Sequence, residues 1–159
     1  MSEIDILSFG ETMAMFVAEH SGDLAQVGHF HKRIAGADSN VAIGLSRLGF
    51  NVAWLSRVGA DSFGRFVVDT LKAEGLDCRF VETDPAHPTG FQLKSLEEHG
   101  ADPRVEYFRR GSAASRLSVN NIAPCPKAGP PCTQLVPLLL LVRTFTARPS
   151  ATELRRCTT

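Results

Sequence analysis

The chain has 159 residues, of which 43% are hydrophobic, as is typical of one globular domain of ordinary size. Its formal net charge is zero, so no excess of either sign indicates a nucleic-acid partner or a cationic one. The acidic start at Met1 to Asp5 does not resemble a signal peptide, and apolar runs such as Leu138 to Val142 are far shorter than the ~20 residues that span a bilayer. We therefore expect a cytoplasmic protein without a membrane partner.

Neither the cysteines nor the histidines are spaced as metal ligands. None of the four cysteines forms a Cys-x-x-Cys pair, which gives a zinc site no support. Cys125 and Cys132 are close enough in sequence to form a disulfide, but a cytosolic chain would keep them reduced. The five histidines show no recognisable ligand spacing, so structural or solvated roles are expected for them.

The first half of the chain alternates predicted strands and helices. Apolar runs predict buried strands over residues 4–9, 13–17 and 52–55. Apolar residues at helical spacing predict helices over 39–48 and 63–74, and Gly49 and Gly75 follow them where C-terminal caps belong. This order is typical of an α/β fold with parallel strands and right-handed crossovers.

A different pattern begins at Thr89. Two strands are predicted, Thr89 to Leu96 and Val105 to Arg109, joined by a polar loop over residues 97–104 with no clear helix between them. A short polar connection suits an antiparallel pair. We expect this pair to lie outside the main sheet, as a small β lid.

The composition changes near Pro124. Residues 1–124 carry 12 basic and 16 acidic residues, whereas residues 125–159 carry five basic and one acidic. Six of the nine prolines lie at or beyond residue 124, and the Pro-rich stretch 124–132 is incompatible with regular helix or central strand. We expect a domain over 1–124 that includes the lid strands, followed by an atypical tail over 125–159. The tail is either a Pro-rich linker with a loose end or a reading in a shifted frame.

The strongest site signal lies at the start of the first helix. Gly36 leaves no side chain where backbone must approach a ligand closely. Asn40 offers a donor and an acceptor, which suits a pair of sugar hydroxyls, and it lies in the first helical turn beside unpaired N–H groups. Asp38 adds a carboxylate acceptor, although helix capping by Asp38 or Ser39 is the alternative. The segment is not Gly-x-Gly-x-x-Gly, so no dinucleotide site is predicted.

Two motifs together resemble the first signature of PfkB-family carbohydrate kinases. One runs Ala35-Gly-Ala-Asp-Ser-Asn40 into a helix that ends in Leu48-Gly49, and the other is Gly59-Ala-Asp-Ser-Phe-Gly64. Ala35 departs mildly from the family, which has a glycine there. The resemblance covers about residues 4–124 and implies the N-terminal part of a ribokinase-like α/β fold, a parallel sheet with flanking helices plus a small β lid. For Asp61 in the second motif we expect helix capping rather than ligand contact.

A third motif, Tyr107-Phe-Arg-Arg-Gly-Ser-Ala113, looks like the corresponding run of 2-keto-3-deoxygluconate kinases. The resemblance implies that Tyr107 and Arg109 bind the sugar acid. A guanidinium can hold a carboxylate through two hydrogen bonds, which a neutral sugar would not need. An exposed amphipathic pair on an edge strand is the alternative. Arg110 points to the other face of the strand and is assigned to the surface, and Gln92 stands where some relatives have tyrosine.

The second signature of the family, Asp-Thr-x-Gly-Ala-Gly-Asp, does not occur in the chain. The resemblance assigns to that signature the aspartate that deprotonates the attacking hydroxyl, and an anion hole for the transferred phosphoryl group. ATP and Mg²⁺ are the cofactors implied for full-length relatives, with a binding site largely outside this chain. We therefore predict no catalytic, ATP-binding or metal-binding residue here, and no activity for the chain alone.

The resemblance leaves three functions open. The first is ATP-dependent phosphorylation of 2-keto-3-deoxygluconate, the second is a kinase of a neutral sugar such as a fructokinase or ribokinase, and the third is a non-catalytic sugar-binding fragment. Arg109 favours the first, because a neutral ligand gives it no carboxylate partner. The expected partner is a small-molecule sugar acid, with no nucleic acid and no membrane. The lid strands are the candidate surface for a homo-oligomer.

Overall fold

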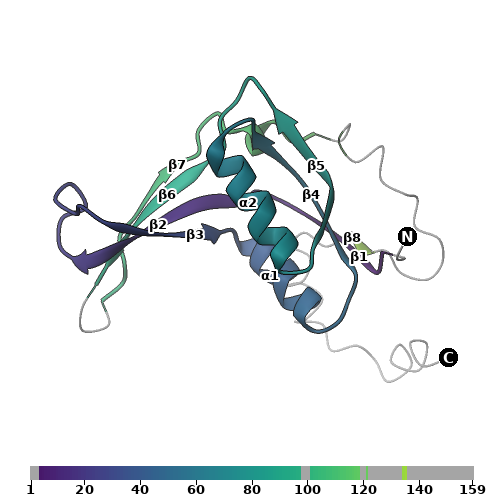
Figure 1. The fold of residues 1–159 in the computed structure, drawn as a ribbon, viewed down its shortest axis with the longest axis horizontal. Coiled ribbons are helices and arrows are strands. Elements are labelled where there is room, and N and C mark those ends of the chain that lie inside the picture. Colours follow the sequence, from purple (N-terminus) through teal and green to yellow (C-terminus); the bar gives the residue numbers. More distant parts are fainter. Residues whose placement is uncertain (1–3, 98–100, 119–120, 122–133, 136–159) are drawn as a thin grey trace, which may run out of the picture.

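Two four-stranded sheets and two helices make up the fold (Figure 1). The computed structural model describes residues 4–97, 101–118, 121, 134 and 135. One sheet, called here the main sheet, is parallel throughout. The other, called here the lid sheet, is mixed and extends to one side of the helices in Figure 1.

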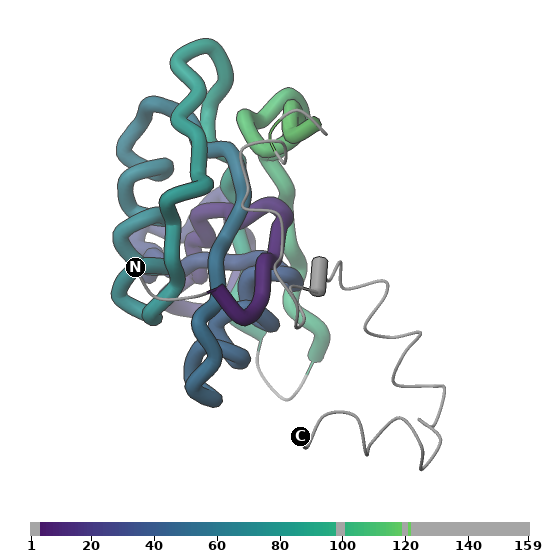
Figure 2. Tube along the Cα trace, turned by 90° about the vertical axis from the view of Figure 1, so that its right-hand side faces the viewer, coloured from purple at the N-terminus to yellow at the C-terminus, as the bar shows by residue number. Residues whose placement is uncertain are grey.

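The main sheet has the strand order β5-β4-β1-β8. Its strands are β1 (Ile6–Phe9), β4 (Val52–Gly59), β5 (Asp77–Asp84) and β8 (Gln134–Leu135). Figure 2 shows β1, in purple, running beside β4, and the register pairs Ile6 with Val52. Seven of the eight residues of β4 are buried, as expected of a central parallel strand covered on both faces.

Helices α1 (Ala37–Arg47) and α2 (Ser62–Ala73) pack against the main sheet (Figure 1). They share one apolar cluster with the main sheet, whose fully buried members include Trp54, Val67 and Leu71. Gly49 and Gly75, just past the two helices, have φ values of 97° and 85°, the left-handed conformation that ends helices. Within the described part of the chain, neither helix is long and apolar enough to cross a membrane.

The lid sheet has the strand order β3-β2-β6-β7. Its strands are β2 (Met13–Ser21), β3 (Phe30–Ala35), β6 (Phe91–Leu96) and β7 (Val105–Phe108). β2 is antiparallel to β3 and parallel to β6, and β6 is antiparallel to β7. A short 3₁₀ helix, η1 (Ala113–Arg116), follows and contacts β4.

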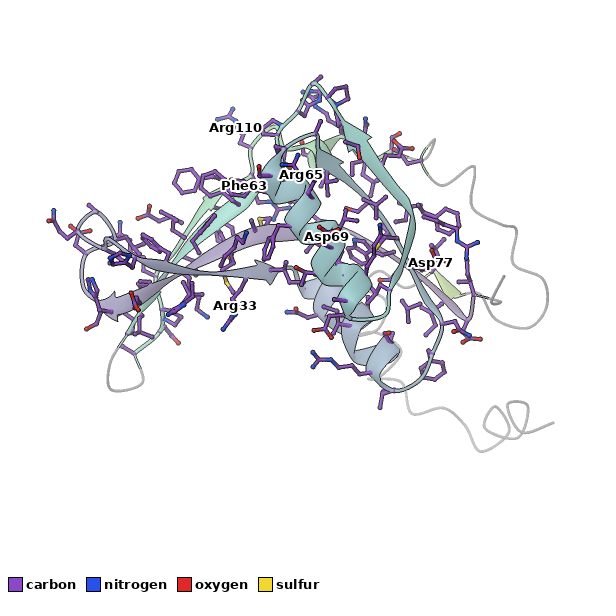
Figure 3. All side chains as sticks on the ribbon, viewed as in Figure 1. Arg33, Phe63, Arg65, Asp69, Asp77 and Arg110 are labelled. Carbon is purple, nitrogen blue, oxygen red and sulfur yellow. The ribbon has the colours of Figure 1, made fainter. Side chains whose placement is uncertain are left out.

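Aromatic side chains join the lid sheet to α2. Phe16 on β2 and Phe91 on β6 lie 5.4 and 5.8 Å, ring centre to ring centre, from Phe63 in the first turn of α2 (Figure 3). Phe108 on β7 stacks on Phe91 at 4.6 Å. This face of the lid sheet is therefore fixed against α2, and the opposite face carries Gln92 and Tyr107, which are paired in the register.

The α/β class, the two helices and the separate antiparallel lid pair are confirmed. The predicted helix starts at Ser39 and Phe63 are late, because α1 begins at Ala37 and α2 at Ser62. The strand predicted at residue 13 belongs to the lid sheet, and three strands, β3, β5 and the two-residue β8, were not predicted. Of these, β3 lacks an apolar run and β5 interrupts its apolar residues with Arg79 and Glu82. Of the tail, only Gln134 and Leu135 are described, so the other predictions for it, including the disulfide between Cys125 and Cys132, lie outside the described residues.

Candidate functional site

The chain crosses from the main sheet to the lid sheet at Gly10 and Glu11, and the start of α1 packs closely against this turn. A Cβ atom at Gly10 would lie 2.6 Å from Asp38 Oδ2, and a Cβ atom at Gly36 would lie 2.6 Å from the carbonyl oxygen of Glu11. Both distances are shorter than van der Waals contact. Glycine at positions 10 and 36 is therefore what allows the helix start to approach the turn.

The backbone of Gly36 caps α1, and no side chain makes a cap hydrogen bond. Ser39 is buried and its hydroxyl donates to the carbonyl of Gly36 at 3.1 Å. Asp38 lies inside the first turn, so neither Asp38 nor Ser39 is the N-cap residue, and the capping interpretation is wrong for both. Asn40 is exposed in the same turn, with its backbone N–H donating to Gly36. Its side chain is therefore open to solvent in the first turn of α1.

Glu11 is the central side chain of the site. Its side chain is only 9% exposed. Oε1 accepts a hydrogen bond of 2.7 Å from Ser112 Oγ, and Oε2 lies 2.6 Å from an Nη atom of Arg109. The motif analysis did not assign Glu11 a role. The signal in the sequence was the Gly10-Glu11 pair directly after the first strand, which fits the family but by itself indicates no contact.

A second close approach closes the site from the lid side. A Cβ atom at Gly90, just before β6, would lie 2.7 Å from Glu11 Oε1 and 3.3 Å from the Cβ of Arg109. The segment after β7 is held there by backbone hydrogen bonds, from Ala113 N–H to Pro88 at 2.8 Å and from Ser112 N–H to Arg109 at 3.1 Å. Glu11 therefore lies in a slot between the lid and the main sheet.

Arg109 and Arg110 have different surroundings, although both lie just past β7, which ends at Phe108 and not at Arg109 as predicted. Arg109 turns toward Glu11 with its side chain 54% exposed. Arg110 is exposed and projects away from the fold in Figure 3. Tyr107 is 59% exposed and lies opposite buried Gln92 in the register. Of the predicted residues, Gly36, Asp38 and Arg109 gather around Gly10 and Glu11, whereas Tyr107 makes no hydrogen bond or ion pair with a described residue.

The Gly59–Gly64 turn is structural, as predicted. Asp61 is the N-cap of α2 and accepts from Gly64 N–H at 2.7 Å and from Thr89 N–H at 2.8 Å. Burial alone would raise the pKa of Asp61, but the hydrogen bonds from Thr89 and Gly64 hold that pKa below its ordinary value. Thr89 Oγ1 in turn accepts from Gly59 N–H at 2.8 Å. The turn thus ties α2 to the segment that enters the lid.

A charged cluster near the ends of β4 and β5 was not predicted from the sequence. Asp84 accepts from Ala86 N–H at 2.8 Å, from His87 Nδ1 at 2.9 Å and contacts Arg57 at 3.1 Å. The hydrogen bond from Ala86 is the main reason that the pKa of Asp84 lies below its ordinary value, and His87 and Arg57 act in the same direction. Arg57 also donates to the carbonyl of Arg116 at 3.3 Å, which anchors η1 to the main sheet.

Two side chains of the site carry groups suited to hydroxyls and to a carboxylate. Asn40 offers amide groups for hydroxyls, and Arg109 offers a guanidinium for an acid. The helix N-termini do not suit a triphosphate, because a carboxylate occupies each of them, Asp38 in α1 and Asp61 in α2. The residues described here also hold no group of three metal-ligand side chains. No catalytic step is therefore assigned to ATP or Mg²⁺ on the described residues.

Comparison with known proteins identifies the family of the chain. The sequence pattern of the pfkB family carbohydrate kinases matches residues 3–130. A 2-dehydro-3-deoxygluconokinase of Bacillus subtilis is 49% identical over 117 residues, which is 73% of this chain and 36% of that protein. The crystal structure of a PfkB protein from Polaromonas sp. JS666 superposes with a TM-score of 0.72 at 49% identity, covering 76% of this chain and 40% of that one.

A sugar kinase of Pyrococcus horikoshii, solved in complex with ATP, has a TM-score of 0.67 at 34% identity and covers 73% of this chain and 37% of its own. The chain thus spans little more than a third of the length of these relatives. The matched region contains both sheets' principal strands, both helices and the Glu11–Arg109 site. The chain belongs to the pfkB family of carbohydrate kinases.

Proposed function

We propose that this chain carries the sugar-acid-binding part of an ATP-dependent kinase that phosphorylates 2-keto-3-deoxygluconate, the compound also named 2-dehydro-3-deoxygluconate. The observation that carries the proposal is the guanidinium of Arg109, half-exposed at the junction of lid and main sheet and next to a helix start that glycines bring close. A kinase of 2-dehydro-3-deoxygluconate among its relatives supports the choice of acid.

The two halves of the site would divide the ligand between them. Arg109 would hold the carboxylate through paired N–H donors, which is the strong geometry for a guanidinium and an acid. The exposed amide of Asn40, in the first turn of α1, would hold hydroxyls, and Gly36 would let the sugar approach the backbone. Asp38 would accept from a further hydroxyl, and Tyr107 would cover the ligand from the lid sheet.

Phosphoryl transfer needs groups that the described residues do not supply. We assign no catalytic base and no nucleotide contact to this chain, and we propose that ATP and Mg²⁺ bind to the parts of the relatives that it does not match. The chain alone would then bind a sugar acid without turnover. Mixed with ATP, Mg²⁺ and 2-keto-3-deoxygluconate, it should form no phosphorylated product above the level without protein, and turnover that survives repurification would contradict this.

Titration calorimetry with 2-keto-3-deoxygluconate and with fructose tests the binding role. Arg109→Ala should weaken binding of the acid by about 1.5–3 kcal/mol, the contribution of a hydrogen bond to a charged group. Arg109→Lys keeps the positive charge beside Glu11 but loses the paired donors. Its affinity for the acid should therefore lie between that of the unaltered chain and that of Arg109→Ala. Arg110→Ala removes the same charge one residue away on the exposed side and serves as the matched control.

The expected result is that only the Arg109 variants lose affinity, and only for the acid. Equal losses for fructose and for the acid would show that Arg109 does not recognise a carboxylate. Equal losses for Arg109→Ala and Arg110→Ala would show that the effect is one of general surface charge. Binding of fructose but not of the acid by the unaltered chain would favour a kinase of neutral sugars.

A further inference from the structure

We infer that Glu11 is a positioning residue for Arg109, which it holds at the edge of the site through an ion pair that leaves the directed N–H donors of the guanidinium for the ligand. This inference rests on the proposed function. It is based on the surroundings of the buried Glu11 carboxylate. Neither the motifs nor the family resemblance assigned a role to this residue.

The first step is the burial of Glu11. Its side chain is 91% buried, in a protein interior where an unpaired carboxylate is strongly unfavourable. Among the described residues Arg109 supplies the only positive charge in contact with it. The cost of leaving Glu11 unpaired therefore keeps the guanidinium at this place, although more than half of the Arg109 side chain is exposed and would otherwise sample many rotamers.

The second step is that Glu11 is itself fixed. Ser112 Oγ donates to Oε1 at 2.7 Å, and Ser112 is only 2% exposed. Gly90 leaves room for the carboxylate and for little else, since a Cβ atom there would lie 2.7 Å from Oε1. Ser112 is also tied to Arg109 through the backbone, with its N–H donating to the Arg109 carbonyl at 3.1 Å. Carboxylate and guanidinium are thus held by the same short segment.

The third step concerns the geometry of the ion pair. Oε2 lies 2.6 Å from the Nη atom of Arg109, yet no N–H group points at it well enough to form a hydrogen bond. The contact is an ion pair to a single Nη atom of Arg109. A guanidinium has five N–H groups in a fixed fork, and with the described residues Arg109 makes no hydrogen bond that uses them. The paired donors stay available for a second carboxylate arriving from solvent.

Two variants separate positioning from mere charge. Glu11→Gln removes the charge and keeps the shape, whereas Ser112→Ala keeps the charge and removes the hydroxyl that orients it. Glu106→Gln is the matched control, because Glu106 also pairs with an arginine, Arg104 at 2.9 Å, but on a more exposed part of the lid. The order of the Arg109 side chain is read without ligand, from ¹⁵N relaxation of its Nε–H signal, assigned with Arg109→Lys.

We expect the Arg109 Nε–H group to become more mobile in Glu11→Gln and Ser112→Ala and to stay unchanged in Glu106→Gln. Binding of 2-keto-3-deoxygluconate should weaken by about tenfold in both site variants, the lower end of what loss of an orienting partner costs elsewhere. Fructose binding should not change. If Glu11→Gln does not fold, Ser112→Ala still gives both readings.

The inference would be overturned if the Arg109 side chain were equally ordered in the site variants and in the unaltered chain. It would also be overturned if Glu11→Gln bound the acid more tightly, because Glu11 would then only repel the ligand's negative charge. The failure of the proposed function looks different. In that case the unaltered chain binds neither compound, while the relaxation data still decide whether Glu11 fixes Arg109.

Discussion

The same substitution, glycine to alanine, should have opposite effects on stability in the two helices. Gly44 in α1 is exposed and a Cβ atom there would meet nothing within 4 Å. Gly64 in the first turn of α2 is buried, and its Cβ atom would overlap the carbonyl oxygen of Gly59 and lie 3.0 Å from Thr89 Oγ1. Both are helical positions, so intrinsic propensity favours alanine in each by up to ~1 kcal/mol.

At Gly64 the overlap is with backbone that cannot move freely, because Gly59 is paired with Asp84 in the main sheet and its N–H is bonded to Thr89. To relieve the overlap α2 must shift, and such overpacking destabilises a protein by about 1–3 kcal/mol. The shift also strains the hydrogen bond from Gly64 N–H to Asp61, which adds about 1 kcal/mol to the loss of stability. After the gain in helix propensity is subtracted, the Gly64→Ala variant should be about 2 kcal/mol less stable than the unaltered chain. The Gly44→Ala variant should be about 0.5–1 kcal/mol more stable than the unaltered chain.

Urea unfolding followed by circular dichroism measures both variants against the unaltered chain, with equal slopes required for the comparison. An unchanged or increased unfolding free energy for Gly64→Ala would refute the close packing of the Gly59–Gly64 turn. A loss for Gly44→Ala as large as for Gly64→Ala would show that both effects come from the helices themselves rather than from contact with Gly59.

Three further predictions concern the main sheet and its helices. Asp61→Ala should lose about 1 kcal/mol or more at neutral pH as a helix cap, whereas Asp69→Ala on the exposed face of α2 should not. Because the pKa of Asp61 is lowered by folding, its contribution is present above its ordinary value of 3.8 and should fade in unfolding curves as pH falls through the lowered pKa. Leu71→Ala should cost about 2–5 kcal/mol by opening a cavity in the core, and near-neutral stability would contradict its full burial. Burial raises the pKa of Cys78 to about 11, so its thiol should resist iodoacetamide at pH 7 until denaturant is added, as mapped by peptide mass spectrometry.

The sequence predicted the helices and the lid pair because their signals are local. Glycine after an apolar helical period gave both helix ends, and the Asp61 cap followed from the spacing to α2. The strand β3 could not be found in this way, because its residues take their order from pairing with β2 rather than from an apolar pattern of their own. Long-range pairing of this kind is invisible to a reading by periodicity.

Only part of the candidate site could be predicted, because contacts between residues distant in sequence leave no local pattern. Gly36, Asp38 and Asn40 are adjacent in sequence, and Arg109 came from a motif of its own. Glu11 was missed because its partners, Arg109 and Ser112, lie about a hundred residues further along the chain. The alternative of helix capping by Asp38 was wrong because α1 starts at Ala37, two residues earlier than the apolar pattern indicates, with Gly36 as its N-cap.

Mapping of the ligand on the chain tests the central claim most directly. Backbone amide shifts would be followed by NMR while unlabelled 2-keto-3-deoxygluconate is added to the ¹⁵N-labelled chain. The account predicts that the largest shifts fall on Gly36, Asn40, Gly90 and Arg109, with the shifts near Arg109 absent when fructose replaces the acid. Shifts centred elsewhere, or the same shifts with both compounds, would contradict a sugar-acid site at the junction of the main sheet and the lid sheet.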